Sequence, residues 1–414
     1  MSHLYNALQK WFDPKSKNIG EKVHVEYRLL CSGELYNLSG CCPPYYIDYW
    51  RSPFLRLILD GLPGLFVTNE PHRNYPQELS FTFDCYMIED STDGSSVIYN
   101  NDQEIADEFV ALLSVLTRRL VCVFCKISEY HYNKETMHGL PQYWPHQVYN
   151  VAAPRIWSVK QATLIYNGQD RPKIKSNMPP PVAVDTAKLT QSLKAFSSLD
   201  EALAENFISA ARLYKTSLTF IEDEPEITYL HLIFAIETVA NIFYKDFVPD
   251  EVKQLETKRT VKELAQKYGL TEPQAKEVTL EACKGISWAK DKFIKFILEY
   301  TDDSIFTEED SLFNFPISMA PSKQNFEKSL ADIYRMRSKA GHEGQPFPPQ
   351  VGLGTQPTVS IHAMTQFQRD FKKTGTGFIV PPAAWFERVA NLALLTYVGR
   401  LTKVTKIAVT DRVH

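Results

Sequence analysis

The stretch Tyr229–Tyr244, YLHLIFAIETVANIFY, is apolar on almost every side of a helix. A helix of this kind lies inside a protein, so the sequence predicts the central helix of a helical bundle. The chain around it follows the same period, because further segments carry apolar residues at helical spacing. These segments are 198–220, 251–268, 272–300, 325–340 and 382–402. The chain after residue 198 is therefore predicted to be an all-α domain.

The first 170 residues have a different period. Lys22–Cys31 and Glu78–Ile88 alternate between apolar and polar residues, and Leu120–Ile127 is a continuous apolar run of strand length. One helix is predicted among these strands, over Asn101–Arg119, where leucines and other apolar residues recur at helical spacing. The sequence pattern of this half of the chain therefore predicts strands with a single helix between them.

A break separates the two halves. Pro179, Pro180 and Pro181 are consecutive, and such a run is compatible with neither a helix nor a central strand. The predicted fold class is α+β, with a strand-rich N-terminal α+β domain followed by a C-terminal all-α helical bundle. The predicted division is a sensor or regulatory domain over 1–175, a proline-rich linker over 176–197, and the helical domain over 198–414.

Composition narrows the class of protein. The 414 residues are 44% hydrophobic and 23% charged, which is typical of a soluble globular protein. The 45 basic and 49 acidic residues give a net charge of −4, which argues against general polyanion binding but allows a local basic site. The seven cysteines are scattered, the N-terminus lacks a signal peptide, and no apolar run reaches about 18 residues. We therefore expect a cytoplasmic protein without a membrane span.

Metal and nucleotide sites are not predicted. Cys122 and Cys125 precede His131 and His138, but a strand turns residues i and i+3 to opposite faces, so buried cysteines and surface histidines are the preferred interpretation. The acidic run at 302–310 lacks the glycine and the spacing of a calcium loop. No phosphate-binding GxxxxGK[ST] sequence and no GxSxG elbow occur. The sequence thus predicts neither a metal nor a cofactor.

Chemistry is concentrated in the segment 333–344, IYRMRSKAGHEG. Arg337 continues the apolar stripe of the predicted helix, and a guanidinium turned toward a core needs a strong acceptor. His342 follows five residues later, roughly 140° away around a straight helix. Gly341 is expected to bend the helix so that the imidazole approaches the arginine. A structural interpretation is also open, in which the arginine stem covers the core and the histidine caps the helix.

This segment resembles the R-x(4–6)-H signature of the HEPN superfamily, in particular its Apea-like branch. Arg337 and His342 fit the signature with four residues between them, and Arg335 fits it with six. Ser338 stands in the place of the polar residue after the arginine. Glu343 departs from the family pattern, because it separates the histidine from the following glycine.

The long apolar helix strengthens the resemblance. Tyr229–Tyr244 is similar to the core helix that these domains place earlier in the chain, with Glu237 at its acidic position. The resemblance covers roughly residues 200–405 and does not extend to 1–170. It implies a metal-independent RNA endonuclease of the toxin or antiviral-defence type, which cleaves RNA by transesterification through the 2′-OH.

The resemblance also implies roles for individual residues. Arg337 and His342 would be catalytic, because a guanidinium stabilises charge on the phosphorane and histidine moves protons near neutral pH. Substrate binding would fall to Arg335, Ser338 and Lys339, and supporting roles to Tyr334 and Glu237. The implied partners are RNA and a second copy bound through the C-terminal domain, for which the helix with Trp385, Phe386, Leu392, Leu394 and Tyr397 offers apolar surface.

An alternative from another class stays open: a non-catalytic HEPN module that binds nucleotide, RNA or a protein partner. The presence of both Arg337 and His342 favours the enzyme, since a binding module needs only one of them. The sequence identifies neither the RNA that is cleaved, nor the trigger, nor the partner of residues 1–170.

Overall fold

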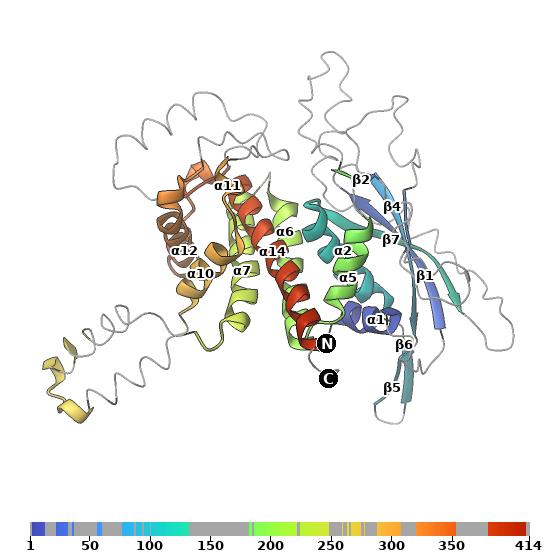
Figure 1. Ribbon diagram of the computed structural model, residues 1–414, viewed down its shortest axis with the longest axis horizontal. Coiled ribbons are helices and arrows are strands. Elements are labelled where there is room, and N and C mark those ends of the chain that lie inside the picture. Colours follow the sequence, from blue (N-terminus) through green and yellow to red (C-terminus); the bar gives the residue numbers. More distant parts are fainter. Residues whose placement is uncertain are drawn as a thin grey trace, which may run out of the picture.

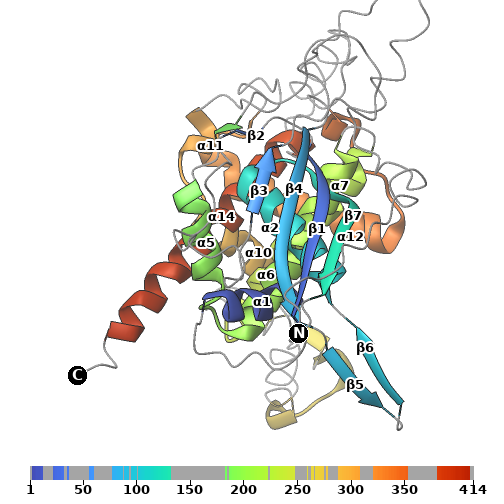
Figure 2. The same cartoon turned by 90° about the vertical axis from the view of Figure 1, so that its right-hand side faces the viewer.

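The computed structural model describes residues 2–12, 22–31, 35–36, 56–59, 77–86, 88–92, 95–99, 101–131, 182–183, 186–221, 224–247, 259, 263–264, 266–274, 277, 288–307, 320–352 and 380–410. Most of these residues are helical. Figure 1 shows a helical body with a sheet along one side, and Figure 2 turns that sheet toward the viewer.

Helix α7, Pro225–Phe243, is the centre of the body, as its apolar sequence predicts. It packs against helices α6, α10, α12 and α14 (Figure 1). The helices of the body are α5 (Thr186–Phe196), α6 (Glu201–Phe220), α7, α10 (Ala289–Tyr300), the short α11 (Ser304–Thr307), α12 (Phe326–Glu343) and α14 (Ala383–Thr410), with 3-10 turns at Lys323–Asn325 and Pro349–Gly352. Tyr229 illustrates the packing, because its ring stacks on Phe347 and Phe386 at 5.4 and 5.0 Å.

Helix ends follow local sequence signals. The carboxylate of Asp200 accepts a hydrogen bond from the backbone N–H of Ala202 at 3.0 Å, which caps the start of α6. Helix α7 has proline in its first turn, where no backbone donor is needed. Helix α12 ends at Gly344, whose φ of 65° is the left-handed conformation that glycine adopts without strain.

The N-terminal part contributes two helices and one main sheet. Helix α1 spans His3–Phe12 and helix α2 spans Asp102–Thr117. The sheet has the antiparallel order β3-β4-β1-β7, with bounds Arg56–Leu59, Gln77–Tyr86, Lys22–Cys31 and Val121–His131. Two-stranded pairs are formed by β2 (Leu35–Tyr36) with β8 (Val182–Ala183) and by β5 (Ile88–Thr92) with β6 (Ser95–Tyr99).

The predicted fold class is wrong: a strand-rich N-terminal α+β domain beside an all-α bundle is not seen. The described chain is predominantly helical, and the N-terminal helices α1 and α2 belong to the same hydrophobic core as α5, α6, α7 and α14. Helix α2 is buried on nearly every side, because it lies between the sheet and α6 (Figure 1). Strand periodicity identified local segments but could not show that their inner face would be covered by helices of the second half.

The predicted bounds of the domains stay a prediction. Residues 132–181, which contain the prolines, lie outside the described residues. Helix α5 occupies Thr186–Phe196, within the range that was predicted as linker. Helix α14 likewise differs from its predicted role, since Trp385, Phe386, Leu394 and Tyr397 are buried in this chain's own core. Those side chains are not available as the surface of a dimer.

A buried ion pair joins the N-terminal part to the last helix. Arg118 ends α2 with a φ of 56°, a left-handed conformation that costs energy in any residue with a Cβ. Its guanidinium binds the carboxylate of Glu387 on α14, and the hydroxyl of Tyr214 on α6 donates to the same carboxylate. Glu387 is completely buried. This contact fixes α2 to the helical body.

Two of the seven cysteines lie in the described core. Cys31 and Cys122 are buried, and burial raises the pKa of the Cys122 thiol above its usual range. Cys122 is thus buried as expected, whereas the side chains of Cys125 and His131 and all of His138 lie outside the described residues.

One described helix, α7, is long and apolar enough to cross a membrane by length and composition, and half of its most apolar window is buried inside the protein.

Candidate functional site

The candidate site is centred on a carboxylate in the middle of α7. Glu237 is 8% exposed, and two side chains of α12 donate to it. The hydroxyl of Tyr334 lies 2.5 Å from its Oε1, and Nη2 of Arg337 lies 3.2 Å from its Oε2. The strong acceptor that the partly buried guanidinium of Arg337 requires is therefore supplied by this chain itself. Three of the predicted site residues are brought together here.

Aromatic rings hold the guanidinium of Arg337 from two sides. Its Cζ lies 5.2 Å from the ring centroid of Phe234 and 5.7 Å from that of Tyr334, which is within the range of cation–π attraction. The Arg337 Nε is buried and has no hydrogen-bond partner among the described residues. The side chain as a whole keeps 26% of its surface exposed. Arg337 is thus a fixed cation at the surface of the body.

Burial of Tyr334 changes its acidity. Desolvation raises the pKa of its hydroxyl well above the usual range, and the hydrogen bond to Glu237 raises it further. The hydroxyl therefore stays protonated and acts as a hydrogen-bond donor. Phe234 was not predicted as part of the site. Its signal is its place three residues before Glu237, since residues i and i+3 share one face of a helix.

His342 lies apart from this cluster. The bend expected at Gly341 is wrong: helix α12 continues through Gly341 to Glu343 and ends only at Gly344. Five residues along an unbroken helix separate Arg337 from His342 by roughly 140°. His342 is exposed in the last turn, while Arg337 faces α7. Within one chain the two side chains therefore point in different directions.

The remaining predicted binding residues surround the same end of α12. Arg335 is exposed and forms an ion pair with the buried Asp332 one turn earlier. Ser338 and Lys339 are half-buried. The carbonyl of Lys339 accepts hydrogen bonds from the backbone N–H groups of Gly344 and Gln345, which close the helix. These residues place polar groups and two cations within two turns of His342.

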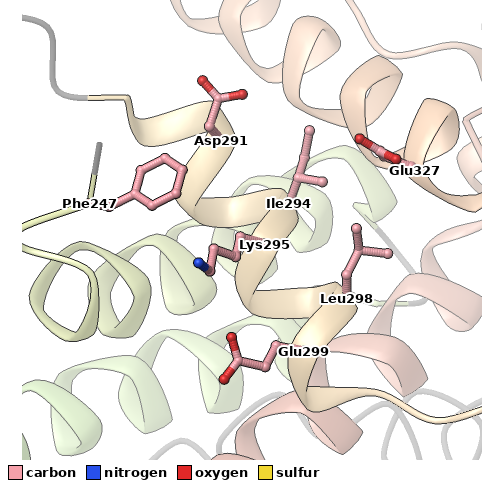
Figure 3. Close-up of a pocket in the computed structure, with 7 residues that line it drawn as sticks. All are labelled: Phe247, Asp291, Ile294, Lys295, Leu298, Glu299 and Glu327. Atoms are coloured by element: carbon pink, nitrogen blue, oxygen red, sulfur yellow. The ribbon is translucent and has the colours of Figure 1, made fainter. Parts of the chain in front are cut away.

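A separate pocket of about 400 Å³ opens between α10, the start of α12 and the chain just after α7 (Figure 3). Its apolar lining consists of Phe247, Ile294 and Leu298. Its charged lining consists of Asp291, Lys295, Glu299 and Glu327. None of these lining residues belongs to the cluster of Phe234, Glu237, Tyr334 and Arg337, so the pocket is distinct from it.

Metal ligands do not gather anywhere in the part of the chain that the structure describes: no group of three His, Cys, Asp or Glu side chains could hold an ion there. In the acidic run, the Asp302 carboxylate accepts a hydrogen bond from the backbone N–H of Ser304 at 2.9 Å. A hydrogen bond from the Ser304 hydroxyl lowers the pKa of Asp302, and this backbone bond lowers it further. Asp302 thus starts the short helix α11, and residues 308–310 lie outside the described residues.

A comparison of the chain with models of known protein families, with curated proteins and with solved structures finds no match.

Proposed function

We propose that this protein is a metal-independent RNA endonuclease of the toxin or antiviral-defence type, whose site lies at the C-terminal end of α12. The observation that carries the proposal is the fixed guanidinium of Arg337, which Glu237, Phe234 and Tyr334 hold at the surface of the body. An exposed histidine, His342, lies on the last turn of the same helix. This combination offers a positioned cation and an imidazole, which can donate or accept a proton.

The chemistry balances without a cofactor. The 2′-oxygen attacks the adjacent phosphorus and loses its proton to a base, while the bond from phosphorus to the 5′-oxygen breaks and that oxygen gains a proton. The products are a 2′,3′-cyclic phosphate and a 5′-hydroxyl. His342 would carry one of these protons, and Arg337 would stabilise the negative charge on the equatorial phosphorane oxygens. Arg335, Ser338 and Lys339 would bind neighbouring phosphates.

The separation of the two side chains requires a second copy. Arg337 and His342 of one straight helix face directions that differ by roughly 140°, so one chain does not direct both at one phosphorus atom. A two-fold axis beside the end of α12 would bring His342 of each protomer to the Arg337 side of the other. The proposed enzyme is therefore a homodimer with composite sites. Its interface uses surface other than the buried aromatic side chains of α14.

A second candidate function is a non-catalytic module that binds RNA, nucleotide or a protein partner. The ion pair with Glu237 favours it, because this carboxylate offsets the charge that Arg337 can offer to a phosphorane. A bound phosphate diester also carries only one negative charge, which a held guanidinium matches. Cleavage itself separates the two candidates.

The test incubates the purified protein with total cellular RNA in EDTA and maps the new ends. We expect cleavage that leaves 2′,3′-cyclic phosphate and 5′-hydroxyl ends, and at least a hundredfold loss in both His342→Ala and Arg337→Ala. His231→Ala is the matched control, because this half-buried histidine of α7 bonds the Ile227 carbonyl through Nδ1. Binding of RNA without any cleavage would favour the non-catalytic module, and full activity in His342→Ala would refute the site.

A further inference from the structure

The pocket of Figure 3 has an apolar lining that is open to water. Ile294 is buried, whereas Leu298, one turn later on α10, keeps 42% of its surface exposed. Phe247 is half-buried and completes the apolar lining. A single exposed leucine is ordinary on a protein surface, but one that lies in a concave surface with two further apolar side chains is typical of a contact site.

The amine in the pocket does not balance its carboxylates. The Lys295 Nζ lies 5.1 Å from the ring centroids of both Tyr244 and Phe247, so two aromatic rings hold this ammonium. Figure 3 shows the amine directed toward Phe247, while Glu327 lies on the opposite side of the pocket, beyond Ile294. Lys295 forms no ion pair with a carboxylate of the described chain.

The pocket lining therefore keeps negative charge. It holds the three carboxylates of Asp291, Glu299 and Glu327 against one amine. Glu299 is partly balanced, because the Tyr244 hydroxyl donates to its Oε2 at 2.6 Å and Arg400 Nη1 lies 4.0 Å from its Oε1. Glu327 is exposed, and no cation among the described residues pairs with it. An apolar lining beside this carboxylate favours an occupant that is both apolar and cationic.

The same charge argues against other classes of occupant. RNA, nucleotides and anionic lipids are negative and would be repelled. A two-fold axis through the pocket would bring the same carboxylates of two copies together. Sites for small molecules enclose most of the ligand, whereas Lys295, Leu298 and Glu299 are exposed and leave the pocket open. A segment of another protein meets these conditions best.

We propose that the pocket is a docking site for a basic, amphipathic segment of a partner protein. One large apolar side chain of the segment would enter between Ile294, Leu298 and Phe247, and a neighbouring lysine or arginine would pair with Glu327. The volume of about 400 Å³ is at the lower end of ligand pockets, which suits side chains of a short segment. The inference does not depend on the proposed ribonuclease function, because the pocket shares no residue with that site.

Selection from a phage-displayed library of random dodecapeptides tests the proposal on the immobilised full-length protein. The library is first depleted on the double variant Leu298→Asn with Glu327→Lys, in which both the apolar lining and the charge are changed. We expect the recovered peptides to share a lysine or arginine next to a large apolar residue. No enrichment on the wild-type protein after this depletion, or enrichment of acidic peptides, would overturn the proposal.

Titration of a recovered peptide by fluorescence anisotropy separates the two contributions. Leu298→Asn should weaken binding about tenfold through the lost apolar contact, and Glu327→Gln about threefold, with a smaller effect at high salt. The matched controls are Leu270→Asn, at a leucine that is 39% exposed, and Glu343→Gln, at the other end of α12; both should leave Kd unchanged. Equal weakening by the controls would overturn the proposal. A wild-type dimer that Leu298→Asn converts to monomer in sedimentation would also overturn it and would assign the pocket to a second copy.

Discussion

Replacing Glu387 tests whether the N-terminal part and the helical body form one cooperative unit. This carboxylate is completely buried and receives hydrogen bonds from Arg118 Nε at 3.1 Å to each oxygen. The hydroxyl of the buried Tyr214 donates to it as well. Glu387→Ala leaves both donors without this acceptor. Breaking a buried ion pair by removing one partner costs about 3–5 kcal/mol.

The expected change in melting temperature follows from the size of the chain. Unfolding entropy of ~2.1 cal/mol/K per residue gives ~0.9 kcal/mol/K for 414 residues, so the loss lowers Tm by about 3–6 °C. Arg118 keeps 18% of its side-chain surface exposed, which places the effect near the lower value. Glu387→Gln retains an acceptor for Tyr214 and should lose about half as much. The assay is scanning calorimetry together with circular dichroism.

The control is Glu104→Ala on the exposed side of α2, which should change the free energy of unfolding by less than ~0.5 kcal/mol. The N-terminal strands and the helices should melt in a single transition in wild type and in Glu387→Ala. Two results contradict the reasoning: a Glu387→Ala shift no larger than that of Glu104→Ala, or an N-terminal transition that is separate in the wild-type protein.

Further predictions concern single side chains. Glu237→Ala should lower RNA cleavage at least tenfold, because Arg337 loses the carboxylate that holds it. Glu237→Gln keeps an acceptor for Tyr334 and should retain more activity than the alanine variant. Single-turnover kinetics of both variants measure the difference. Arg335→Ala should raise KM several-fold with little change in kcat, since Arg335 is proposed only to bind phosphate. Burial and a raised pKa should make Cys122 react with iodoacetamide at pH 8 at least tenfold more slowly than a free thiol, measured by peptide mapping.

Periodicity predicted α2, α6, α7, α12 and α14, because each of them buries a stripe of its own sequence, but it did not predict α1 and α5. Helix α7 is the clearest case: its all-round apolar sequence is explained by neighbours on several sides. The sequence also predicted that Arg337 needs a strong acceptor, because its guanidinium lies in an apolar stripe. That Glu237 is this acceptor, and that Tyr334 shares it, is a finding of the structure. What linked these residues to a specific chemistry was the resemblance of the motif, which the geometry alone does not supply.

Contacts between residues far apart in the chain could not be predicted from the sequence, for a physical reason. The pair of Arg118 with Glu387 joins residues 269 positions apart, and neither local pattern signals it. The left-handed conformation of Arg118 at the end of α2 is likewise not a preference of arginine itself. For the same reason the aromatic residues of α14 were interpreted as surplus surface, although α7, α10 and α11 cover them. A sequence reports how apolar a face is, but not which element covers it.

Gly341 decides between two geometries for the proposed enzyme. A Cβ added there meets no atom within 4 Å, and its φ is not left-handed, so alanine fits the helix as it stands. Gly341→Ala should therefore stabilise the protein by about 0.5–1 kcal/mol. Gly344→Ala is the matched opposite, because its φ of 65° strains any side chain, and it should destabilise by about 1 kcal/mol.

The consequence for activity depends on whether α12 must bend. In the composite dimer, Arg337 meets the partner's histidine across the two-fold axis, so a stiffer helix leaves cleavage unchanged or slightly faster. If the helix of one chain bent at Gly341 to bring its own His342 to Arg337, alanine would hinder that motion. A variant that gains thermal stability but loses cleavage at least tenfold would thus refute the composite site and establish a bent, single-chain one. Unchanged cleavage together with raised stability would support a straight α12 in the active enzyme, and therefore a site that requires a second copy of the chain.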